Sequence, residues 1–473
     1  MHRWRSGPRS RLQRGDGVTA KLIGYGTYLP RYRLAGSDIG LRGGDRVVAS
    51  FDEDSTTMAV AAARSAIESH DPPDHVYFAT SSPAYGDKTN ATAVHAALGL
   101  PAQAFAADVG GTGRSTIAAL RLAAGSGGLA LSADVRVGRP GSADEKLGGD
   151  GAAALLFGEG PAIADVVASV SSTSEFLDRW RAPDSVTGEQ WEERFGAQRY
   201  GDLISAAAAA TLDQAGLPEV DHVVLACPNS AIVKRAASLI KGAVSTTTSP
   251  IGFSGTADAA LGLCGALDRV EPGQTILMVS AVDGCDTLLL RATDRISNAR
   301  QRQSLRAQRE GGLPVSYLTY LAWRGLVERE PPRRPEPDRP AGPPAARAAD
   351  WKFALTGSRC RECGFVHLPP VRVCRECGVA DSMSSVPVSR LGGTIVTYTV
   401  DRLAYSPSPP VVQAVIDVDG GGRCTLEIAD AEPDRLAVGA RVGFTFRRLF
   451  TAGGVHDYFW KARLADQAET EES

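Results

Sequence analysis

The stretch Ala106-Ala-Asp-Val-Gly-Gly-Thr-Gly-Arg-Ser-Thr-Ile-Ala-Ala-Leu120 runs from the end of an apolar strand, through three glycines, into an Ala/Leu-rich helix. Gly110, Gly111 and Gly113 permit a positive φ angle or the close approach of another chain segment. The helix expected from about Arg114 presents free N–H groups that favour a developing negative charge. We therefore expect a reactive site at this turn.

The composition is that of an ordinary soluble protein with several domains. The chain has 473 residues, of which 43% are hydrophobic and 22% charged, and its formal net charge is −3. At roughly 150 residues per domain, this length predicts about two to four domains. No apolar run approaches the ~18 residues of a membrane-spanning helix, and the basic tail 1–17 lacks the apolar core of a secretory signal. We expect a cytoplasmic protein without a membrane partner, with a second short tail at 466–473.

The chain also contains an internal duplication. Asp74-His-Val-Tyr-Phe-Ala-Thr-Ser81 and Asp221-His-Val-Val-Leu-Ala-Cys-Pro228 are alike, and each follows an Ala-rich helical stretch. Downstream, Gly110-Gly-Thr112 and Ser254-Gly-Thr256 each lead through an Ala/Leu helix to an apolar strand. Two such copies with continuously apolar strands predict buried, largely parallel sheets covered by helices. We place the two halves at residues 18–165 and 166–327.

The opening stretch resembles the nucleophile turn of the thiolase superfamily, especially of hydroxymethylglutaryl-CoA synthase and ketoacyl-ACP synthase III. In those enzymes an Asp precedes the acylated Cys by five residues, and a small-residue helix ending in Ala-Ala-Leu follows; Asp108 and Ala118-Ala-Leu120 keep this register. Leu22-Ile-Gly-Tyr-Gly-Thr-Tyr-Leu-Pro-Arg-Tyr-Arg-Leu34 is similar to the opening strand of archaeal-type synthases, and Gly148-Gly-Asp-Gly-Ala-Ala-Ala-Leu-Leu-Phe157 to their glycine-to-strand element. The resemblance covers about residues 18–296 and implies a duplicated, layered α/β thiolase fold.

The resemblance also implies four catalytic positions, and none carries the family's residue here. The occupants are Ser81 in place of Glu, Gly113 in place of the nucleophilic Cys, Ala226 in place of His and Phe253 in place of Asn. Synthase chemistry needs a thiolate, an acid/base group and an oxyanion donor. No Cys lies between Met1 and Ala226, so a shift in register cannot supply the nucleophile. We expect the glycines of the turn to offer an oxyanion hole but no acyl-enzyme.

Other side chains are candidates for the missing roles. Tyr85 and Asp258, the latter on a helix expected to face the same cavity, are the acid/base candidates; the alternatives are a packed phenol and a helix cap. Cys227 adjoins the His position, but a Cys at the end of an apolar strand is typical of a core. Lys88, Lys234 and Arg235 lie near where the family holds the CoA phosphates, or else are solvated charges.

A second unit follows the body. Residues 298–311, rich in Arg and Gln, predict an exposed helix, and 328–349 predict a Pro-rich linker. Cys360-Arg-Glu-Cys363 and Cys374-Arg-Glu-Cys377, each followed by Gly, form two knuckles that suit tetrahedral zinc better than a redox dithiol. Four Cys ligands leave no open position, so we expect structural zinc in a ribbon over 350–385, with His367 surplus as a ligand.

Residues 386–465 predict a small all-β barrel, because strands with period two alternate with Gly, Pro and Asp turns. Ribbon and barrel together resemble the rubredoxin-like zinc ribbon and OB-fold that accompany thiolase-like proteins. An OB-fold alone would favour nucleic acid, but the usual basic, aromatic-rich strand face is not evident. We therefore favour acyl-CoA over nucleic acid as the ligand.

Three functions remain open. The chain is an enzyme for aldol or retro-aldol chemistry on an acyl-CoA or acyl-carrier thioester without an acyl-enzyme, a non-catalytic partner of an active thiolase-like subunit, or a nucleic-acid-binding barrel on an inert body. The first is favoured, since it needs only an oxyanion hole and one acid/base group. The superfamily resemblance further implies a two-fold dimer through the body, either a homodimer or a heterodimer.

Overall fold

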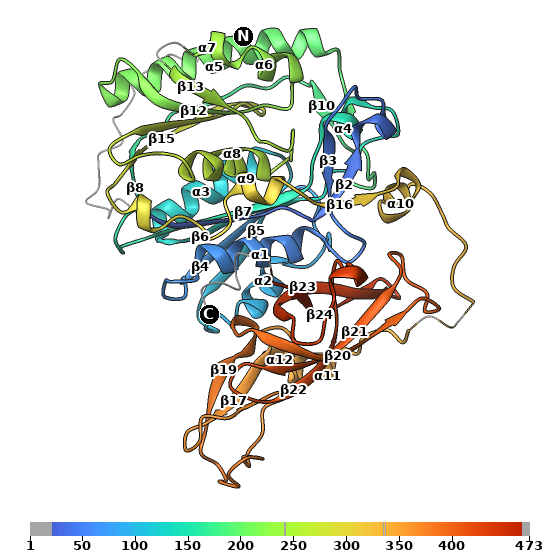
Figure 1. Ribbon diagram of the computed structural model, residues 1–473. Coiled ribbons are helices and arrows are strands. Elements are labelled where there is room, and N and C mark those ends of the chain that lie inside the picture. The colour runs from blue at the N-terminus through green and yellow to red at the C-terminus, as the bar shows by residue number, and fades with distance from the viewer. Residues whose placement is uncertain (1–20, 241–242, 334, 336, 466–473) are drawn as a thin grey trace.

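The computed structural model describes residues 21–240, 243–333, 335 and 337–465 (Figure 1). The predicted tails at 1–17 and 466–473 lie outside the described residues. Within those ranges, eleven strands of the body form one sheet in the order β13-β12-β14-β15-β8-β1-β7-β6-β4-β5, with β9 (Ser171–Thr173) against β15. No helix in the described part of the chain is long and apolar enough to cross a membrane.

The first half of the body alternates apolar strands with Ala-rich helices. Its first helix begins with a capping box, in which the Asp54 side chain accepts from the Thr57 N–H and the Thr57 hydroxyl accepts from the Asp54 N–H. The main elements are β1 (Lys21–Tyr28), α1 (Ser55–Ala66), β4 (His75–Thr80), α2 (Ala91–Ala97), β5 (Phe105–Gly110), α3 (Ser115–Ser126), β6 (Gly128–Asp134), α4 (Ala143–Leu147) and β7 (Gly151–Gly158).

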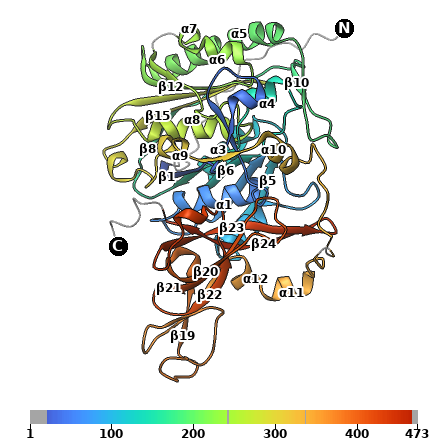
Figure 2. The same ribbon diagram turned by 45° about the vertical axis from the view of Figure 1, so that its right-hand side comes forward.

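The second half repeats this order. Its elements are β8 (Ala164–Ala168), β10 (Arg179–Trp180), β11 (Glu189–Gln190), α5 (Glu193–Ala215), β12 (Val220–Ala226), α6 (Ser230–Lys234), α7 (Ala236–Leu239), β13 (Ala243–Thr247), α8 (Ala257–Leu267), β14 (Thr275–Ser280) and β15 (Gly284–Ala292). Helices α3 and α8 pack between the two halves of the sheet, α5 covers the outer face of the second half, and α1 covers that of the first (Figures 1 and 2). This layering confirms the duplicated thiolase-like fold.

The sheet is mixed, so the expectation of largely parallel sheets is wrong. In each half one strand has two parallel neighbours: β4 lies between β5 and β6, and β12 lies between β13 and β14. The next strands, β7 and β15, are antiparallel to β6 and β14. Continuously apolar strands show that both faces of a sheet are covered, but they do not fix the direction of its neighbours.

The segment that joins body and barrel is less helical than predicted. Instead of one helix over 298–311 it contains a short turn, η2 (Ile296–Asn298), and the five-residue α9 (Leu305–Arg309). The helix starts only at Leu305 because Ser304 caps it and Asp268 accepts the Leu305 N–H at 2.7 Å. The segment also contains β16 (Leu313–Val315), α10 (Tyr317–Trp323), α11 (Gly342–Arg347) and α12 (Ala349–Lys352). Strand β16 pairs with β2 (Tyr32–Ala35), which is followed by η1 (Gly36–Ile39) and pairs with β3 (Asp45–Val48).

The C-terminal unit is a ribbon followed by a five-stranded barrel. The ribbon strands are β17 (Thr356–Cys360), β18 (Val366–His367) and β19 (Met383–Pro387); η3 (Val388–Arg390) leads to β20 (Gly393–Asp401), β21 (Val411–Val418), β22 (Arg423–Glu427), η4 (Pro433–Arg435), β23 (Arg441–Ala452) and β24 (Val455–Leu464). The barrel strands run in the order β22-β21-β20-β23-β24, all antiparallel. A bridge from Ile428 to Ala462 brings the two edges together, as expected for an OB-fold.

Buried ion pairs join the barrel to the body. Arg447 on β23 is 1% exposed and lies 3.0 Å from Asp52 and 3.1 Å from Glu53, just before α1. It also pairs with Asp430 of the barrel at 2.7 Å. Lys461 on β24 reaches Asp52 at 2.9 Å. Because these charges are removed from water, removing the partner of any one of them across the interface would leave an unfavourable unpaired charge and destabilise the folded protein.

Candidate functional site

The glycine turn between β5 and α3 meets the equivalent turn of the second half. Gly111 has a φ of +120°, which favours glycine. A Cβ at Gly113 would lie 3.3 Å from the Gly255 carbonyl oxygen and 3.4 Å from Val282 Cγ2, so the turn is closely packed. The Gly113 N–H has no hydrogen-bond acceptor among the described residues.

Arg114 fixes the start of α3 against β15. Its Nε donates to Asp286 Oδ2 at 2.8 Å, and its Nη1 donates to the Asp283 carbonyl oxygen at 2.8 Å. Asp283 has a φ of +50°. Burial and the nearby Asp178 carboxylate raise the pKa of Asp283. The turn is thus held by contacts to the opposite half of the sheet.

Asp134, at the end of β6, organises the loops around this turn. Its carboxylate accepts from the Ser81 N–H and the Ser81 hydroxyl, each at 2.7 Å, and from the Thr256 N–H at 2.8 Å. The hydroxyls of Thr80 and Ser82 donate to the same group. Asp134 is fully buried. Ser81 is consequently committed to a structural network.

A cavity of about 190 Å³ lies beside Phe253. The Phe253 ring is flanked by the guanidinium groups of Arg136 at 5.4 Å and Arg179 at 5.3 Å, in cation–π contact. Asp178 and Asn229 lie on the wall contributed by the second half. Phe253 therefore supplies a wall of the cavity where the resemblance implied an amide.

Asp258, in the first turn of α8, is a buried acid whose backbone N–H donates to the Gly255 carbonyl oxygen of the glycine turn in the second half at 3.4 Å. It is 5% exposed and accepts from the Ser254 N–H at 3.3 Å and the Ser254 hydroxyl at 3.4 Å. Burial raises the pKa of Asp258 to about 7. A carboxyl group with such a pKa can both take and give a proton near neutral pH.

The cysteines of the body are in the core. Cys227 is 2% exposed, and Cys264 and Cys285 have no exposed surface. Burial raises the pKa of all three thiols. A buried neutral thiol is a poor nucleophile, so these residues pack rather than react.

The other predicted residues lie apart from Asp258. The Tyr85 hydroxyl accepts the His456 N–H of the barrel at 2.7 Å, and the two rings are 4.8 Å apart. Lys88 is exposed and donates to Thr92 Oγ1 at 2.9 Å, just before α2. Lys234 and Arg235 are exposed at the end of α6, on the opposite side of the body in Figure 1. The structure therefore does not bring Lys88 close to the adjacent pair Lys234 and Arg235.

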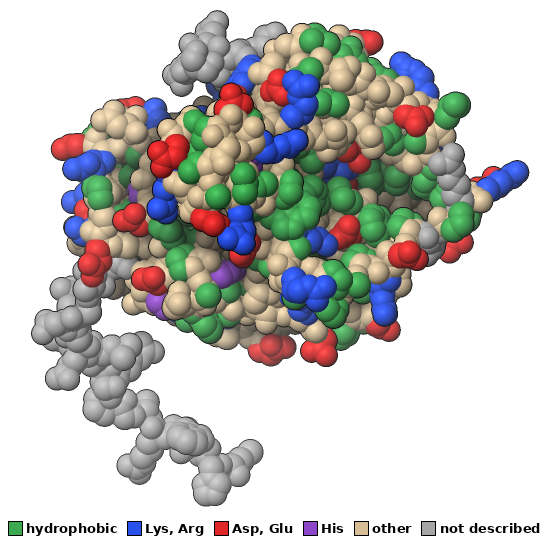
Figure 3. All heavy atoms as spheres, turned by 90° about the horizontal axis from the view of Figure 1, so that it is seen from below, with side chains coloured by type: hydrophobic (Ala, Val, Ile, Leu, Met, Phe, Trp, Pro, Cys, Tyr) green, Lys and Arg blue, Asp and Glu red, His purple; other side chains and the backbone are tan. Residues whose placement is uncertain are grey.

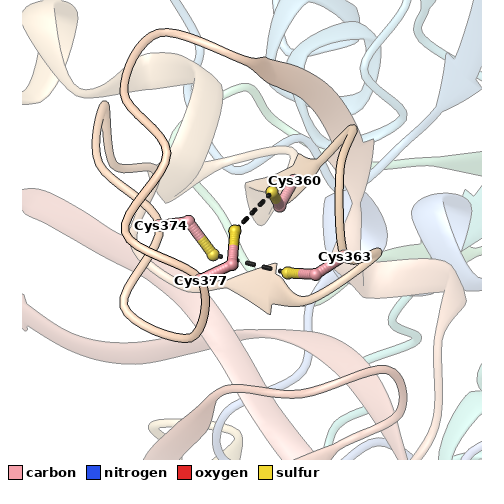
Figure 4. Close-up of side chains that lie close together, drawn as sticks. All are labelled: Cys360, Cys363, Cys374 and Cys377. Carbon is pink, nitrogen blue, oxygen red and sulfur yellow. Dashed lines mark hydrogen bonds between the residues drawn. The ribbon is translucent and has the colours of Figure 1, made fainter.

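The four ribbon cysteines converge on one point (Figure 4). The sulfur of Cys360 is 3.6 Å from that of Cys377, and the same distance separates the sulfurs of Cys363 and Cys374. All four lie within 4.8 Å of one another. A tetrahedral zinc with bonds of about 2.3 Å places its sulfurs about 3.8 Å apart, so the donor set and spacing fit this metal.

The amino-acid sequence matches curated hydroxymethylglutaryl-CoA synthases over the body. It is 31% identical over 340 residues to the enzyme of Archaeoglobus fulgidus, a match that covers 65% of this chain and 99% of that protein. It is 32% identical over 318 residues to the enzyme of Methanopyrus kandleri, which covers 60% of this chain and 91% of that protein. The chain belongs to the hydroxymethylglutaryl-CoA synthase family.

Solved structures of this family share the fold. An HMG-CoA synthase complexed with CoA aligns with a TM-score of 0.56 and 19% identity, covering 64% of this chain and 89% of that one. MvaS in complex with 3-hydroxy-3-methylglutaryl coenzyme A aligns with a TM-score of 0.57 and 17% identity, covering 68% and 94%. These likenesses confirm the thiolase-like architecture of the body.

The C-terminal unit matches two further families. The family model described as "ChsH2, rubredoxin-like zinc ribbon domain" matches residues 353–382, and that described as "ChsH2, C-terminal OB-fold domain" matches residues 385–447. The predicted ribbon and OB-fold are thereby confirmed. This chain thus joins a synthase-family body to a unit of a different family.

Sequence reasoning missed residues that the fold brings to the site from distant segments. Asp134 accepts hydrogen bonds from both halves of the body, and Arg136 and Arg179 flank Phe253. The one local signal was an Asp directly after an apolar strand, in the repeated element that ends at Asp134 and again at Asp283. Neither Arg136 nor Arg179 carries such a signal.

Proposed function

We propose that this protein binds an acyl-CoA or acyl-carrier thioester and makes or breaks a carbon–carbon bond in it by aldol or retro-aldol chemistry, without an acyl-enzyme. The observation that carries the proposal is that Gly113, which has no side chain, packs against the Gly255 carbonyl oxygen, and the same oxygen accepts from the backbone N–H of Asp258, a buried acid whose pKa is about 7. Relatives with solved structures are described as complexed with CoA, with 3-hydroxy-3-methylglutaryl coenzyme A and with an acetyl donor-ACP, which supports this ligand class.

The roles follow from the chemistry. In the aldol direction, the Asp258 carboxylate takes a proton from the carbon next to the thioester carbonyl, and the carbonyl oxygen gains negative charge. The resulting enolate carbon attacks the carbonyl carbon of a second substrate to form the carbon–carbon bond, and the new alkoxide takes the proton back from Asp258. The free Gly113 N–H, at the start of α3, donates to that oxygen. In the retro-aldol direction, the Asp258 carboxylate takes the proton of the β-hydroxyl, the carbon–carbon bond breaks to give a carbonyl compound and an enolate, and the same N–H stabilises the enolate until its carbon takes the proton from Asp258.

The ribbon has a supporting role in this proposal. Zinc held by the four ribbon cysteines is structural, because a site with four thiolates has no open position for a substrate. The chemistry therefore belongs to the body.

Exchange of the α-proton of acetyl-CoA with deuterium from the solvent tests the proposal. We expect wild-type protein to catalyse this exchange and Asp258→Asn to lose it at least about a hundredfold, the scale of general base catalysis. Asp294→Asn, which removes an exposed carboxylate, should leave exchange unchanged. Equal exchange by Asp258→Asn and wild type would refute the role of Asp258.

A non-catalytic partner subunit is the second candidate, and the edge strand β5 favours it. Among the described strands, β5 pairs only with β4, and Phe105 at its start is 54% exposed. An open strand edge next to the glycine turn can pair with a second chain. Light scattering measures the molar mass of the protein alone and in a mixture with an active family member. A monomer in both samples would exclude pairing through β5.

A further inference from the structure

A groove lies between the body and the barrel. It has a volume of about 560 Å³. Helix α1 and the segment around α9 form its body side, and η3, β23 and β24 form its barrel side. Among the described residues, none lines both this groove and the cavity beside Phe253. The groove is therefore separate from the candidate active site.

Arginine dominates the lining of this groove, which we call the arginine groove. Its acidic lining residues within the described ranges are Glu68 and Glu310. The arginines are Arg31, Arg33, Arg64, Arg302, Arg390, Arg441 and Arg463. Three of them have a carboxylate partner: Arg31 pairs with Glu432, Arg302 with Glu68 and Arg441 with Asp419. The other four form no ion pair with any described residue.

Arg33 is held in place by neutral groups and keeps an unused donor. Its guanidinium donates to the carbonyl oxygens of Pro30 at 2.6 Å and Gln308 at 2.8 Å. The residue is 7% exposed, and its Nε has no hydrogen-bond partner. Burial lowers the pKa of Arg33 to about 10. A buried charge without a counter-charge is unfavourable unless an anion accompanies it.

Arg64, Arg390 and Arg463 bring like charges together from both domains. Arg64 on α1 donates to the Phe444 carbonyl oxygen at 2.5 Å and to that of Ser389, so carbonyls of the barrel fix its position. Burial, followed by the charges of Arg390 and Arg463, lowers the pKa of Arg64 to about 10. Arg390 and Arg463 make no side-chain hydrogen bond with a described residue. The three groups repel one another in the absence of an anion.

We propose that the arginine groove binds a small ligand that carries two or more linked phosphate groups, of the nucleoside diphosphate class. Guanidinium groups match phosphate oxygens with paired hydrogen bonds and stay charged at neutral pH. The groove has the size of a small-molecule site, which is typically about 300–1,000 Å³. A bound diphosphate supplies the counter-charges that the four unpaired arginines lack. This inference does not depend on the proposed function of the body.

A compact phosphate ligand suits this surface better than a nucleic acid. Binding of an extended strand needs a continuous basic track. On the face shown in Figure 3, Lys and Arg side chains alternate with Asp and Glu. Four arginines that form no ion pair with a described residue are instead gathered in one groove between two domains. The same diphosphate chemistry is present in a free nucleotide and in the nucleotide end of CoA.

Calorimetric titration of the full-length protein with ADP and, separately, with CoA tests the proposal. We expect Arg390→Gln with Arg463→Gln to weaken binding at least about tenfold, because two charge-assisted contacts are lost. The double variant Arg390→Lys with Arg463→Lys keeps both charges but loses the paired hydrogen bonds, so its affinity should lie between that of wild type and that of the double Gln variant. Arg295→Gln with Arg347→Gln, which removes two exposed arginines outside the groove, should bind like wild type.

The outcomes separate the sources of the ligand. If ADP binds and the double variant Arg390→Gln with Arg463→Gln (the Gln pair) binds it more weakly, the ligand is a free nucleotide. If only CoA binds and the same double variant binds it more weakly, the ligand is the nucleotide end of CoA. Without ligand, the Gln pair should raise the Tm, because it relieves repulsion around Arg64. No binding of either probe, equal binding by the Gln pair, or tighter binding of a single-stranded RNA than of ADP would overturn the proposal.

Discussion

Position 113 is a glycine, so this residue brings no side-chain nucleophile to the turn, and in the proposed function its backbone N–H donates to the thioester carbonyl oxygen. The Asp258 carboxyl group lies behind the facing turn, buried and bonded to Ser254. The glycine at position 113 and the carboxyl group at position 258 are single residues within a fold that the family shares. A glycine at the nucleophile position is visible in the sequence, whereas the burial that tunes Asp258 depends on the packing of α8 between the two half-sheets.

The pKa of Asp258 makes a prediction for stability. Its value of about 7 in the folded protein exceeds the ordinary 3.8, so the folded state binds more protons between these pH values. The stabilisation is therefore complete below about pH 4 and is lost as the pH rises to about 7. We expect Asp258→Asn to gain stability relative to wild type between pH 5 and pH 8, by roughly 3 kcal/mol.

Urea unfolding of Asp258→Asn and wild type at pH 5 and at pH 8 measures this difference in stability. Asp294→Asn, with an exposed carboxylate, should show no such change with pH. A stability difference between Asp258→Asn and wild type that stays constant from pH 5 to pH 8 would show that the carboxyl group has an ordinary pKa in the folded protein.

At the scale of elements, local sequence motifs predicted the structure better than patterns that depend on distant segments. The two Cys-Arg-Glu-Cys motifs predicted a four-cysteine metal site, because each motif is a short turn that places two thiolates together. The order of the strands could not be predicted in this way. Strands β6 and β7 pair antiparallel, although their apolar runs look like those of parallel strands. Pairing direction depends on connections, while apolar content depends only on burial.

The ribbon should depend on its metal. We expect purified protein to hold about one zinc per chain, and chelation to unfold the region after Asp350 before the body, since such sites supply on the order of 10 kcal/mol of folding free energy. Metal analysis of Cys360→Ser, with Cys424→Ser on β22 as a control outside the knuckles, measures the dependence. Unchanged zinc in Cys360→Ser would contradict it.

At the scale of the whole molecule, buried ion pairs join the body to the barrel. The arginines of the groove and the ion pairs of Arg447 come from segments hundreds of residues apart in the chain. The sequence predicted both domains, but a local pattern does not reveal which charges meet across an interface. The predicted linker 328–349 does not indicate how the two units lie against each other, and the structure packs β23 against α1.

Arg447 tests this coupling. Arg447→Met leaves Asp52, Glu53 and Asp430 buried without their shared counter-charge, so we expect a loss of roughly 3–5 kcal/mol in unfolding free energy. Arg423→Met breaks an exposed pair with Asp417 and should change stability by less than about 1 kcal/mol. Urea denaturation of both variants compares them, and similar small losses would show that the interface does not need these charges.

The central claim is that the turn at Gly113 binds a thioester without becoming acylated. Intact-mass spectrometry after incubation with acetyl-CoA and acetoacetyl-CoA, paired with calorimetric titration of the same samples, tests it most directly. We predict heat of binding and an unchanged protein mass, because Gly113 has no nucleophile and the nearby thiol of Cys227 is buried. A gain of one acyl group, located in a peptide that contains Cys227 or the turn, would contradict this claim.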